Sequence, residues 1–397
     1  MEYEKKVLKE NLELYRKTLF DGVIPFWINY SLDLKNGGYY TCLDEDGTVY
    51  DTDKFTWMQA REIWCFSHIY NRYGEKYKYL LDAAKLGIDF LLKNLVSKNG
   101  DFYFSSDEKG NPLIAPYNIY SDCFACMAIA EYGFAINDNS YLDLSKKIYA
   151  NIQKRKDNPK GKYNKAEENE RKFHSFGFSM IQVNLAQVLK RFDDNPFYDQ
   201  MIFNETKLII ENHIDEKQKI VFERVSLDKK RYNCMENRLL CPGHTCELIW
   251  FLAKSAKDNN DIQLIDLLSR ALLWTLERGW DEKYGGIFYY QDSEGFPTEK
   301  VESNMKLWWV HVEALYATLY LYSLTKNEEL FNWYVKIHSW SFSHFNDDKY
   351  GEWYGYLERD GSLAKTMKGG KWKGMFHLPR ALIESISTIE YLLLEDL

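Results

Sequence analysis

A glycine-rich, aromatic stretch that ends in an acidic turn recurs along the chain and decides the fold. It reads NGGYYTCLDEDG at residues 36–47, NGDFYFSSDEKG at 99–110, YGGIFYYQDSEG at 284–295 and YGEWYGYLERDG at 350–361. In each copy, glycine precedes a short aromatic segment, and an acidic turn closes on a second glycine. This pattern predicts a strand–turn–strand hairpin.

Two weaker copies complete a regular series. They read GKYNKAEENERK from Gly161 and QKIVFERVSLDKKR from Gln218. The six copies begin 58 to 66 residues apart, so six units of similar length account for nearly all of the 397 residues. Self-similarity at such a period indicates a repeat architecture.

Each unit also contains two helical stretches. One follows the hairpin and is apolar on nearly every face, as in FTWMQAREIWCFSHIYNRY (55–73) and LWWVHVEALYATLYLY (307–322). The other precedes the next hairpin and is amphipathic, as in KYLLDAAKLGIDFLLKNL (78–95). An apolar inner set and an amphipathic outer set predict an all-α fold: a closed (α/α)6 barrel of six helical-hairpin repeats, with short β-hairpins crowning one end. We expect residues 1–397 to form one domain, with an open solenoid as the structural alternative.

The overall composition limits the classes of function. The chain carries 51 Lys and Arg against 59 Asp and Glu, a net charge of −8, and 45% of its residues are hydrophobic. This composition excludes disorder and gives no general attraction to nucleic acid or to an anionic membrane surface. Aromatic residues make up 16% of the chain, which favours a large aromatic core.

The start of the chain and the cysteines predict a reducing compartment. The charged start Met1-Glu-Tyr-Glu-Lys-Lys lacks the apolar region of a signal peptide, and no apolar run approaches the ~18 residues that cross a bilayer. Seven scattered cysteines do not suit a disulfide framework. Cys123-x-x-Cys126 is a weak metal or redox signal, which we interpret as two buried apolar residues of a helix. We expect a soluble, cytoplasmic protein.

Five polar residues share one position of the repeat. Arg61, Asn184, His244, Glu313 and His377 lie 23 to 28 residues after the starts of their hairpins. In a closed barrel this position is the beginning of an inner helix, beside the hairpins, where side chains converge on a central pocket. The shared position predicts the functional site.

Two of these residues are histidines at predicted helix starts. His244 follows Pro-Gly in CPGHTCELIW (241–250), so its imidazole stands where the positive end of the helix dipole favours the neutral ring of a general base. Glu247 falls on the same helix face and either orients that ring or completes a capping box. His377 precedes Pro379 and also begins an inner helix. A helix-capping His244 and a loop His377 are the structural alternatives.

Arg61 and Glu313 lie inside apolar helices, where an unpaired charge is costly. The two residues therefore either pair with each other across the barrel or meet a polar ligand. Trp57 precedes Arg61 by four residues, as Trp309 precedes Glu313, so each indole shares a helix face with a charged group. Aromatic faces beside hydrogen-bonding groups suit a sugar. The sequence contains no metal-ligand cluster and no phosphate-binding glycine loop, so we expect no metal site.

The chain resembles the N-acylglucosamine 2-epimerase family over essentially its full length. The matching stretches are TWMQARE (56–62), LLCPGHTCELIWFL (239–252), KLWWVHVEAL (306–315), YGEWYGYLERDG (350–361) and KGGKWKGMFHLPR (368–380). The last motif resembles the acylglucosamine branch of the superfamily rather than the cellobiose branch. The resemblance implies an (α/α)6 barrel, a homodimer, and interconversion of N-acetylglucosamine and N-acetylmannosamine in amino-sugar metabolism on the sialic acid pathway.

The resemblance also implies roles for individual residues. His244 and His377 match the catalytic histidine pair, and Arg61, Glu247 and Glu313 match further residues that activity needs. Pocket positions of the wider superfamily correspond to Tyr117, Asn184, Trp309 and Trp372, to which we add Trp57 from its place beside the arginine.

The implied chemistry requires no metal or redox cofactor. Many relatives use a nucleotide, typically ATP, as an activator that is not consumed. The corresponding stretch here is DNPKGKYNKAEENERK (157–172), which departs from the Arg-Pro-Gln-type motif expected there. Lys160, Lys162 and Lys165 remain as candidate phosphate contacts.

Proton transfer at a sugar carbon fits these residues. Removing the proton next to an open-chain aldehyde gives an enediolate-like intermediate, and return of a proton to the other face inverts the carbon. Histidine takes and gives protons near neutral pH, and Arg61 is suited to stabilise the developing oxyanion. The alternatives are aldose–ketose isomerisation, glycoside hydrolysis by Glu247 and Glu313, and a non-enzymatic protein-binding role.

Overall fold

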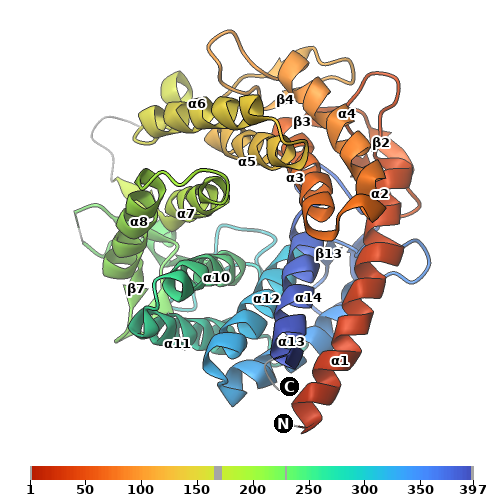
Figure 1. Cartoon of the computed structure of the whole chain (residues 1–397). Helices are drawn as coiled ribbons and strands as arrows, with labels where there is room; N and C mark the ends of the chain where they lie inside the picture. Colours follow the sequence, from red (N-terminus) through yellow and green to blue (C-terminus); the bar gives the residue numbers. More distant parts are fainter. Residues whose placement is uncertain (1, 165–171, 229, 395–397) are drawn as a thin grey trace.

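Pairs of helices wind into a ring, with one helix of each pair inside and one outside (Figure 1). The computed structural model describes residues 2–164, 172–228 and 230–394. Within these ranges the inner helices are α3 (Thr56–Tyr73), α5 (Ile119–Ala135), α7 (Phe176–Lys190), α10 (Pro242–Asp258), α12 (Trp308–Thr325) and α14 (His377–Leu394). The outer helices are α1 (Glu2–Lys17), α4 (Lys78–Asn94), α6 (Asn139–Arg155), α8 (Phe197–His213), α11 (Ile262–Gly279) and α13 (Glu328–Phe345). The predicted all-α barrel of helical hairpins is confirmed.

Shorter elements complete the described chain. The first outer helix continues through a π-helical turn, Thr18–Val23, into α2 (Ile24–Tyr30). Single turns of helix lie at Glu75–Tyr77, Gly161–Tyr163 and α9 (Met235–Arg238). The strands are β1 (Cys42–Leu43), β2 (Val49–Asp51), β3 (Lys54–Phe55), β4 (Ser105–Ser106), β5 (Pro112–Ile114), β6 (Phe173–Ser175), β7 (Ile214–Asp215), β8 (Ile220–Val221), β9 (Arg224–Ser226), β10 (Leu239–Leu240), β11 (Gln291–Asp292), β12 (Lys306–Leu307), β13 (Tyr356–Leu357) and β14 (Leu363–Lys365).

Inner and outer helices differ in how much of their surface is buried. α12 buries every residue from Trp308 to Ser323, because it packs between two inner helices and against outer ones. α13 buries a single stripe from Leu330 to Phe345 at helical spacing, as an amphipathic helix does. One hydrophobic core runs from Leu8 to Leu392 and includes Cys123 and Cys126 as free, buried thiols. Among the described helices, none has the length and apolarity to cross a membrane.

The backbone follows the sequence repeat at the predicted starts. Each start holds a residue with a positive φ: Gly37 (86°), Gly100 (83°), Gly161 (53°), Lys219 (53°), Gly285 (73°) and Gly351 (74°). At Gly161 the described residues form a single helical turn, and most of the third copy lies outside the described residues. Glycine adopts this backbone region at the least cost, which explains why it recurs in the repeat. In the fourth unit a lysine occupies the position, so this copy is weak in the sequence although its backbone is the same.

Within the described residues, strand pairs link the second, fourth, fifth and sixth units to the unit before each of them. β3 pairs with β4, β6 with β9, β10 with β11, and β12 with β13, all antiparallel. The first strand of each pair leads directly into an inner helix, and the second belongs to the hairpin of the next unit. The N-termini of the inner helices and the hairpins therefore lie at the same end of the barrel, as the repeat predicts.

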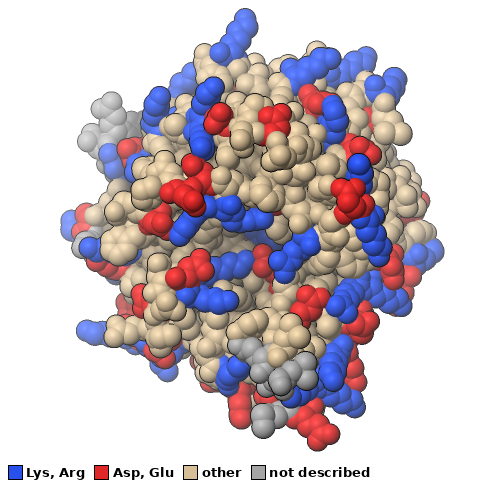
Figure 2. Space-filling model, viewed as in Figure 1, with Lys and Arg blue, Asp and Glu red and all other residues tan. Residues whose placement is uncertain are grey.

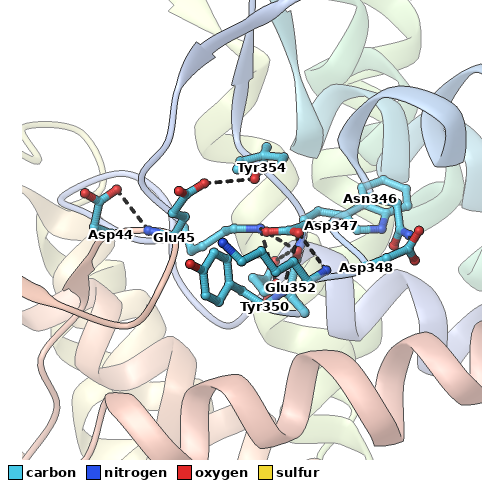
Figure 3. A network of polar contacts seen from close by, with 12 residues as sticks. Asp44, Glu45, Asn346, Asp347, Asp348, Tyr350, Glu352 and Tyr354 are labelled. Atoms are coloured by element: carbon cyan, nitrogen blue, oxygen red, sulfur yellow. Dashed lines mark hydrogen bonds and ion pairs between the residues drawn. The ribbon is translucent and has the colours of Figure 1, made fainter.

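The ring closes between the sixth unit and the first. The backbone N–H groups of Lys368 and Gly369 donate to the carbonyl oxygen of Leu43 at 2.9 and 3.1 Å. The Tyr354 hydroxyl donates to Glu45 at 2.9 Å across the same junction (Figure 3). We call this junction, between residues 27–57 and 352–372, the seam. Because the seam is hydrogen-bonded, the open solenoid alternative is wrong.

Buried ion pairs fix the segments that lead into three of the inner helices. In the described chain, Nζ to carboxylate distances are 2.7 Å for Lys54–Asp33, 3.2 Å for Lys306–Asp281 and 2.8 Å for Lys368–Asp347. Figure 3 shows Asp347 in the network of the sixth hairpin. All three lysine side chains are fully buried, so loss of a partner would leave an uncompensated charge. The pairs thus fix the starts of α3, α12 and α14, which carry site residues.

Candidate active site

A cavity of about 790 Å³ opens at the hairpin end of the barrel. We call it the front cavity. Its wall combines the first turns of the inner helices with hairpin residues. Of the ten residues predicted for the site, seven line it: Trp57, Arg61, His244, Glu247, Trp309, Trp372 and His377. Of the five residues that share one position of the repeat, Arg61, His244 and His377 line this cavity.

His377 is the first residue of α14, and its ring is held by Glu313 of α12. The His377 Nδ1 lies 2.7 Å from Oε1 of Glu313. Two further donors fix the carboxylate: Nη2 of Arg380 lies 2.6 Å from Oε1, and Nε1 of Trp250 lies 2.7 Å from Oε2. Because an ionised carboxylate only accepts hydrogen bonds, Nδ1 carries a proton and Nε2 of the neutral ring is free to accept one.

The charge state of His377 is set by its surroundings. Burial lowers the pKa of His377 well below its ordinary value, and the positive charges of Arg61 and Arg380 act in the same direction. The Glu247 carboxylate opposes this shift without reversing it. The ring is therefore neutral at neutral pH, which is the form that abstracts a proton.

His244 is held by a carboxylate that comes from a hairpin. Its Nδ1 lies 3.2 and 3.3 Å from the two carboxylate oxygens of Glu223, between β8 and β9. Desolvation opposes a charged ring, but the Cys241 sulfur and the Glu223 carboxylate raise the pKa of His244 well above its ordinary value. This direction is opposite to the neutral His244 expected from the helix dipole, because Cys241 and Glu223 together outweigh the partial charge of a helix end.

Trp309 contacts both histidines. Its ring centroid lies 5.0 Å from that of His244 and 5.6 Å from that of His377. One cavity therefore holds two imidazoles whose pKa values are shifted in opposite directions. Environments that separate the pKa values of two titratable groups distinguish a proton donor from a proton acceptor.

Arg61 places an unpaired cation on the cavity wall. Its guanidinium packs on the rings of Trp57, Phe124 and Phe376 at 4.9, 4.1 and 4.8 Å. Its buried Nε has no hydrogen-bond partner. Burial lowers the pKa of Arg61 to about 9, so the side chain stays charged at neutral pH. The expected pair with Glu313 is not formed, and the guanidinium is left for an oxygen atom of a ligand.

Glu247 belongs to a carboxylate cluster rather than to the first histidine. Its Oε1 accepts a hydrogen bond from Nη2 of Arg380, the same nitrogen that donates to Glu313. Glu223 holds the ring of His244 instead, so the orienting contact expected of Glu247 is not formed. Arg380 thus forms hydrogen bonds with both Glu247 and Glu313, a connection that the sequence did not predict.

Two groups of side chains have the donor atoms of a metal site. Their ligand atoms lie within 4.8 Å of one another, and the groups are Glu247, Glu313 and His377, and Glu223, Cys241 and His244. In the first group Arg380 already supplies positive charge to both carboxylates. In the second, the imidazole itself takes this role when it is protonated.

Two predicted sugar-binding residues lie outside the front cavity. Tyr117 packs on Phe104 with 5.1 Å between ring centroids. Asn184 is the ninth residue of α7 and lines a second cavity, since it lies about 4.5 Å deeper along its helix than the sixth position. Trp372 does line the front cavity; it is 54% exposed and meets Trp57 edge-on at 5.0 Å.

Two residues of the site, Glu223 and Arg380, were not predicted from the sequence. Glu223 lies in the weak fourth copy of the hairpin, where nothing separates it from ordinary turn residues. Arg380 follows His377 by three residues on the same helix face, and this spacing is the signal that would have identified it. Further polar and aromatic residues of the wall are Arg224, Tyr289, Tyr290, Lys300 and Glu302.

Comparisons with known proteins identify the family of the chain and agree with its fold. The family model described as N-acylglucosamine 2-epimerase (GlcNAc 2-epimerase) matches residues 38–381. The N-acylglucosamine 2-epimerase of Bos taurus is 33% identical over 394 residues, covering 96% of this chain and 92% of that protein. The human protein of the same name is 32% identical, with 96% and 91% covered. The solved cellobiose 2-epimerase of Bacillus thermoamylovorans superposes with a TM-score of 0.82 at 24% identity, covering 96% and 99% of the two chains.

The family model and these relatives define the class of enzyme, the carbohydrate isomerases. Within this class, the chain belongs to the N-acylglucosamine 2-epimerase family. It is therefore a carbohydrate epimerase.

Proposed function

We propose that this epimerase interconverts N-acetylglucosamine and N-acetylmannosamine by proton transfer at C2. The observation that carries the proposal is the histidine pair, in which His377 favours the neutral ring and His244 the protonated one. The names of the mammalian relatives support the choice of sugar.

In the proposed mechanism the two rings act on opposite faces of one carbon. Nε2 of neutral His377 takes the C2 proton of the open-chain sugar, and the electron pair moves onto the carbonyl oxygen. Arg61 stabilises the resulting enediolate-like charge, because its buried Nε has no hydrogen-bond partner within the described residues. Protonated His244 then returns a proton to the other face, and the two roles exchange in the reverse direction. Glu313 and Glu223 act as positioning residues that fix the orientation of the rings.

The alternative reactions fit the geometry less well. In hydrolysis, one of the two carboxylates must act as a protonated acid. Glu247 and Glu313 both accept hydrogen bonds from Arg380, so neither carboxylate is free to take up the position of that acid at a glycosidic bond. Aldose–ketose isomerisation uses the same enediolate but returns the proton to C1, a task that needs only one histidine. A second histidine on the same cavity favours epimerisation.

We also propose the setting in which the enzyme works. The free, mostly buried cysteines support a reducing compartment, the cytoplasm. The continuous core supports residues 1–397 as one domain. The family resemblance supports a homodimer and a place in amino-sugar metabolism on the sialic acid pathway.

Activation by a nucleotide finds little support in the described residues. Lys160 and Lys162 lie on an exposed turn that lines none of the cavities described here, whereas Lys165 lies outside the described residues. We therefore assign no step to a nucleotide.

The decisive experiment is incubation with N-acetylmannosamine in D2O, followed by proton NMR. Formation of N-acetylglucosamine with deuterium at C2 is the expected result. In a parallel incubation with mannose, which carries a hydroxyl group at C2, appearance of fructose would instead support aldose–ketose isomerisation. Recovery of unchanged, unlabelled N-acetylmannosamine would contradict epimerisation of this substrate.

A further inference from the structure

The wall of the front cavity is polar on one side and apolar on the other. The charged and imidazole side chains that the inner helices place in it come from α3, α10 and α14. Two neighbouring inner helices, α5 and α7, contribute none of these. Within the part of the chain that the structure describes, they line the cavity with Tyr120, Phe124, Gly177, Met180 and Ile181. We call these five residues the α5–α7 side, and the proposed mechanism gives it no role.

Helix geometry brings the apolar side chains of the α5–α7 side to one depth. Tyr120 and Phe124 are four residues apart and share a face of α5, whereas Met180 and Ile181 are adjacent on α7. Phe124 and Ile181 each occupy the sixth position of their helix, as Arg61 does in α3. Phe124, Met180 and Ile181 keep 6%, 7% and 6% of their surface exposed. Because they line the cavity, a ligand bound there can contact them.

The α5–α7 side begins directly beside Arg61. The ring centroid of Phe124 lies 4.1 Å from the central carbon of the Arg61 guanidinium. In the proposed mechanism this guanidinium faces the oxygen atom at C1 of the open-chain sugar. C2, which carries the acylamino group, is one bond away from C1. An acyl group on C2 therefore lies within reach of Phe124.

Tyr120 adds a hydrogen-bonding group to this apolar wall. Within residues 2–164, 172–228 and 230–394 its hydroxyl makes no hydrogen bond with the protein. A Cβ atom built on Gly177 would lie 3.5 Å from the hydroxyl oxygen, so this oxygen stands beside the first turn of α7. Burial raises the pKa of Tyr120, so the hydroxyl keeps its proton and is able to donate it in a hydrogen bond.

An apolar wall in a polar cavity selects an apolar part of the ligand. Figure 2 shows Lys, Arg, Asp and Glu side chains spread over the face of the molecule that it draws, in contrast to the apolar lining on α5 and α7. An N-acetylhexosamine carries hydroxyl groups along its carbon chain, and the acetyl group supplies its one methyl group. A hydroxyl loses hydrogen bonds to water against an apolar wall, whereas a methyl group gains by leaving water.

We propose that the α5–α7 side is the acyl subsite of the front cavity. Phe124, Met180 and Ile181 contact the methyl group of the substrate's acyl group, and the Tyr120 hydroxyl donates a hydrogen bond to the acyl carbonyl oxygen. This inference rests on the proposed function and adds the residues that determine which acyl group the enzyme accepts. Ile181, which projects into the subsite at the depth of Arg61, limits the length of the acyl chain.

Measurements of kcat/KM with N-acetyl-, N-propanoyl- and N-butanoylmannosamine test the acyl subsite. Ile181→Ala enlarges the subsite, so the ratio of kcat/KM for the N-butanoyl sugar to that for the N-acetyl sugar should rise at least tenfold. One methylene in an apolar pocket discriminates between substrates by about 10–200-fold. Ile181→Val makes a smaller change of the same kind and should shift the ratio in the same direction. Ile129→Ala, a buried position deeper in α5 and outside the front cavity, is the matched control and should keep the wild-type ratio.

Tyr120→Phe tests the hydrogen bond to the acyl carbonyl oxygen. KM for N-acetylmannosamine should rise about two- to tenfold, as loss of a neutral hydrogen bond implies. kcat should change less than KM, because the bound sugar and the enediolate-like intermediate make this contact equally. Tyr132→Phe, on the same helix but outside the front cavity, is the control and should leave both constants unchanged.

The outcomes separate the subsite from the proposed function. An active enzyme whose acyl preference is the same in Ile181→Ala and in the wild type, or shifts equally in Ile129→Ala, would overturn the subsite alone. An unchanged KM in Tyr120→Phe would remove the hydroxyl from the subsite. A wild type that is inert toward all three sugars would overturn the proposed function and the subsite with it.

Discussion

Nδ1 of His377 lies 2.7 Å from Oε1 of Glu313, although 64 positions separate the two residues in the chain. This separation is close to one repeat, so a ring nitrogen of the sixth unit is held by a carboxylate of the fifth. His244 and Glu223, by contrast, belong to the same unit. The carboxylate that holds His377 therefore comes from a neighbouring unit, whereas the carboxylate that holds His244 comes from its own unit. Substitutions at the two histidines and their carboxylates can be distinguished by experiment.

Loss of either histidine should abolish most of the turnover. We expect His244→Ala and His377→Ala each to lower kcat by about 10²–10⁴-fold, the usual contribution of acid–base catalysis. Circular dichroism and thermal unfolding should stay close to the wild type, because neither side chain holds the core. His344→Ala, on α13 away from the front cavity, is the control. Near-normal kcat in either variant would remove that histidine from the mechanism.

Deuterium uptake should show how the two histidines divide the work. If they face opposite sides of C2, each variant should still exchange the C2 proton of one pure epimer with D2O, and the preferred epimer should differ between His244→Ala and His377→Ala. Arg61→Ala should slow exchange from both epimers, since the enediolate charge is common to both directions. NMR of each epimer measures this. If both histidine variants lose exchange from the same epimer, one histidine is the sole base.

The pH profile should respond to Glu223 in one direction only. The lowered pKa of His377 places the acidic limb of kcat/KM below the ordinary histidine range, and the raised pKa of His244 places the alkaline limb above it. Glu223→Gln removes the negative charge that stabilises the imidazolium of His244, so the alkaline limb should move to lower pH. The acidic limb should stay in place.

The control for this shift is Glu236→Gln. Glu236 is another carboxylate of the fourth unit, but it pairs with Arg224 at 3.4 Å and has no contact with the histidine. Its profile should match that of the wild type. An alkaline limb that moves equally in both variants, or in neither, would contradict the assigned role of Glu223.

Two arginines of the front cavity should behave in opposite ways in unfolding experiments. Arg61→Met removes a buried, unpaired charge, so stability should be at least that of the wild type while kcat falls by roughly 10²–10³-fold. Arg380→Met leaves Glu247 and Glu313 as unpaired buried carboxylates, which costs about 3–5 kcal/mol. Urea unfolding midpoints compare the two variants. Equal losses of stability would show that Arg61 has a structural partner after all.

The fold was largely predictable from the sequence because the repeat has a backbone cause. A positive φ at each hairpin start selects glycine in five units, and the helix periodicity separates inner from outer helices. The fourth unit was the weak one because Lys219 adopts the same backbone without the glycine that marks it.

The site was predictable in part. Arg61, Glu247 and Glu313 all occupy the sixth position of their inner helices, so the repeat brings them to one depth. Asn184 shares the spacing from its hairpin but sits three residues deeper, because its helix begins earlier relative to the hairpin. The ion-pair partners could not be predicted from the sequence. Which carboxylate pairs with which cation depends on side-chain geometry across the barrel, and the spacing of residues in the sequence does not specify that geometry.

The seam has one further consequence. Trp57 and Arg61 lie on its first-unit side, whereas Trp372, His377 and Arg380 lie on its sixth-unit side. Only non-covalent contacts, such as the hydrogen bond from Trp57 Nε1 to the Lys371 carbonyl oxygen, hold these two groups together. Enzymatic activity therefore depends on closure of the ring. A denaturant concentration that separates the two sides of the seam should abolish activity while most of the helix content remains.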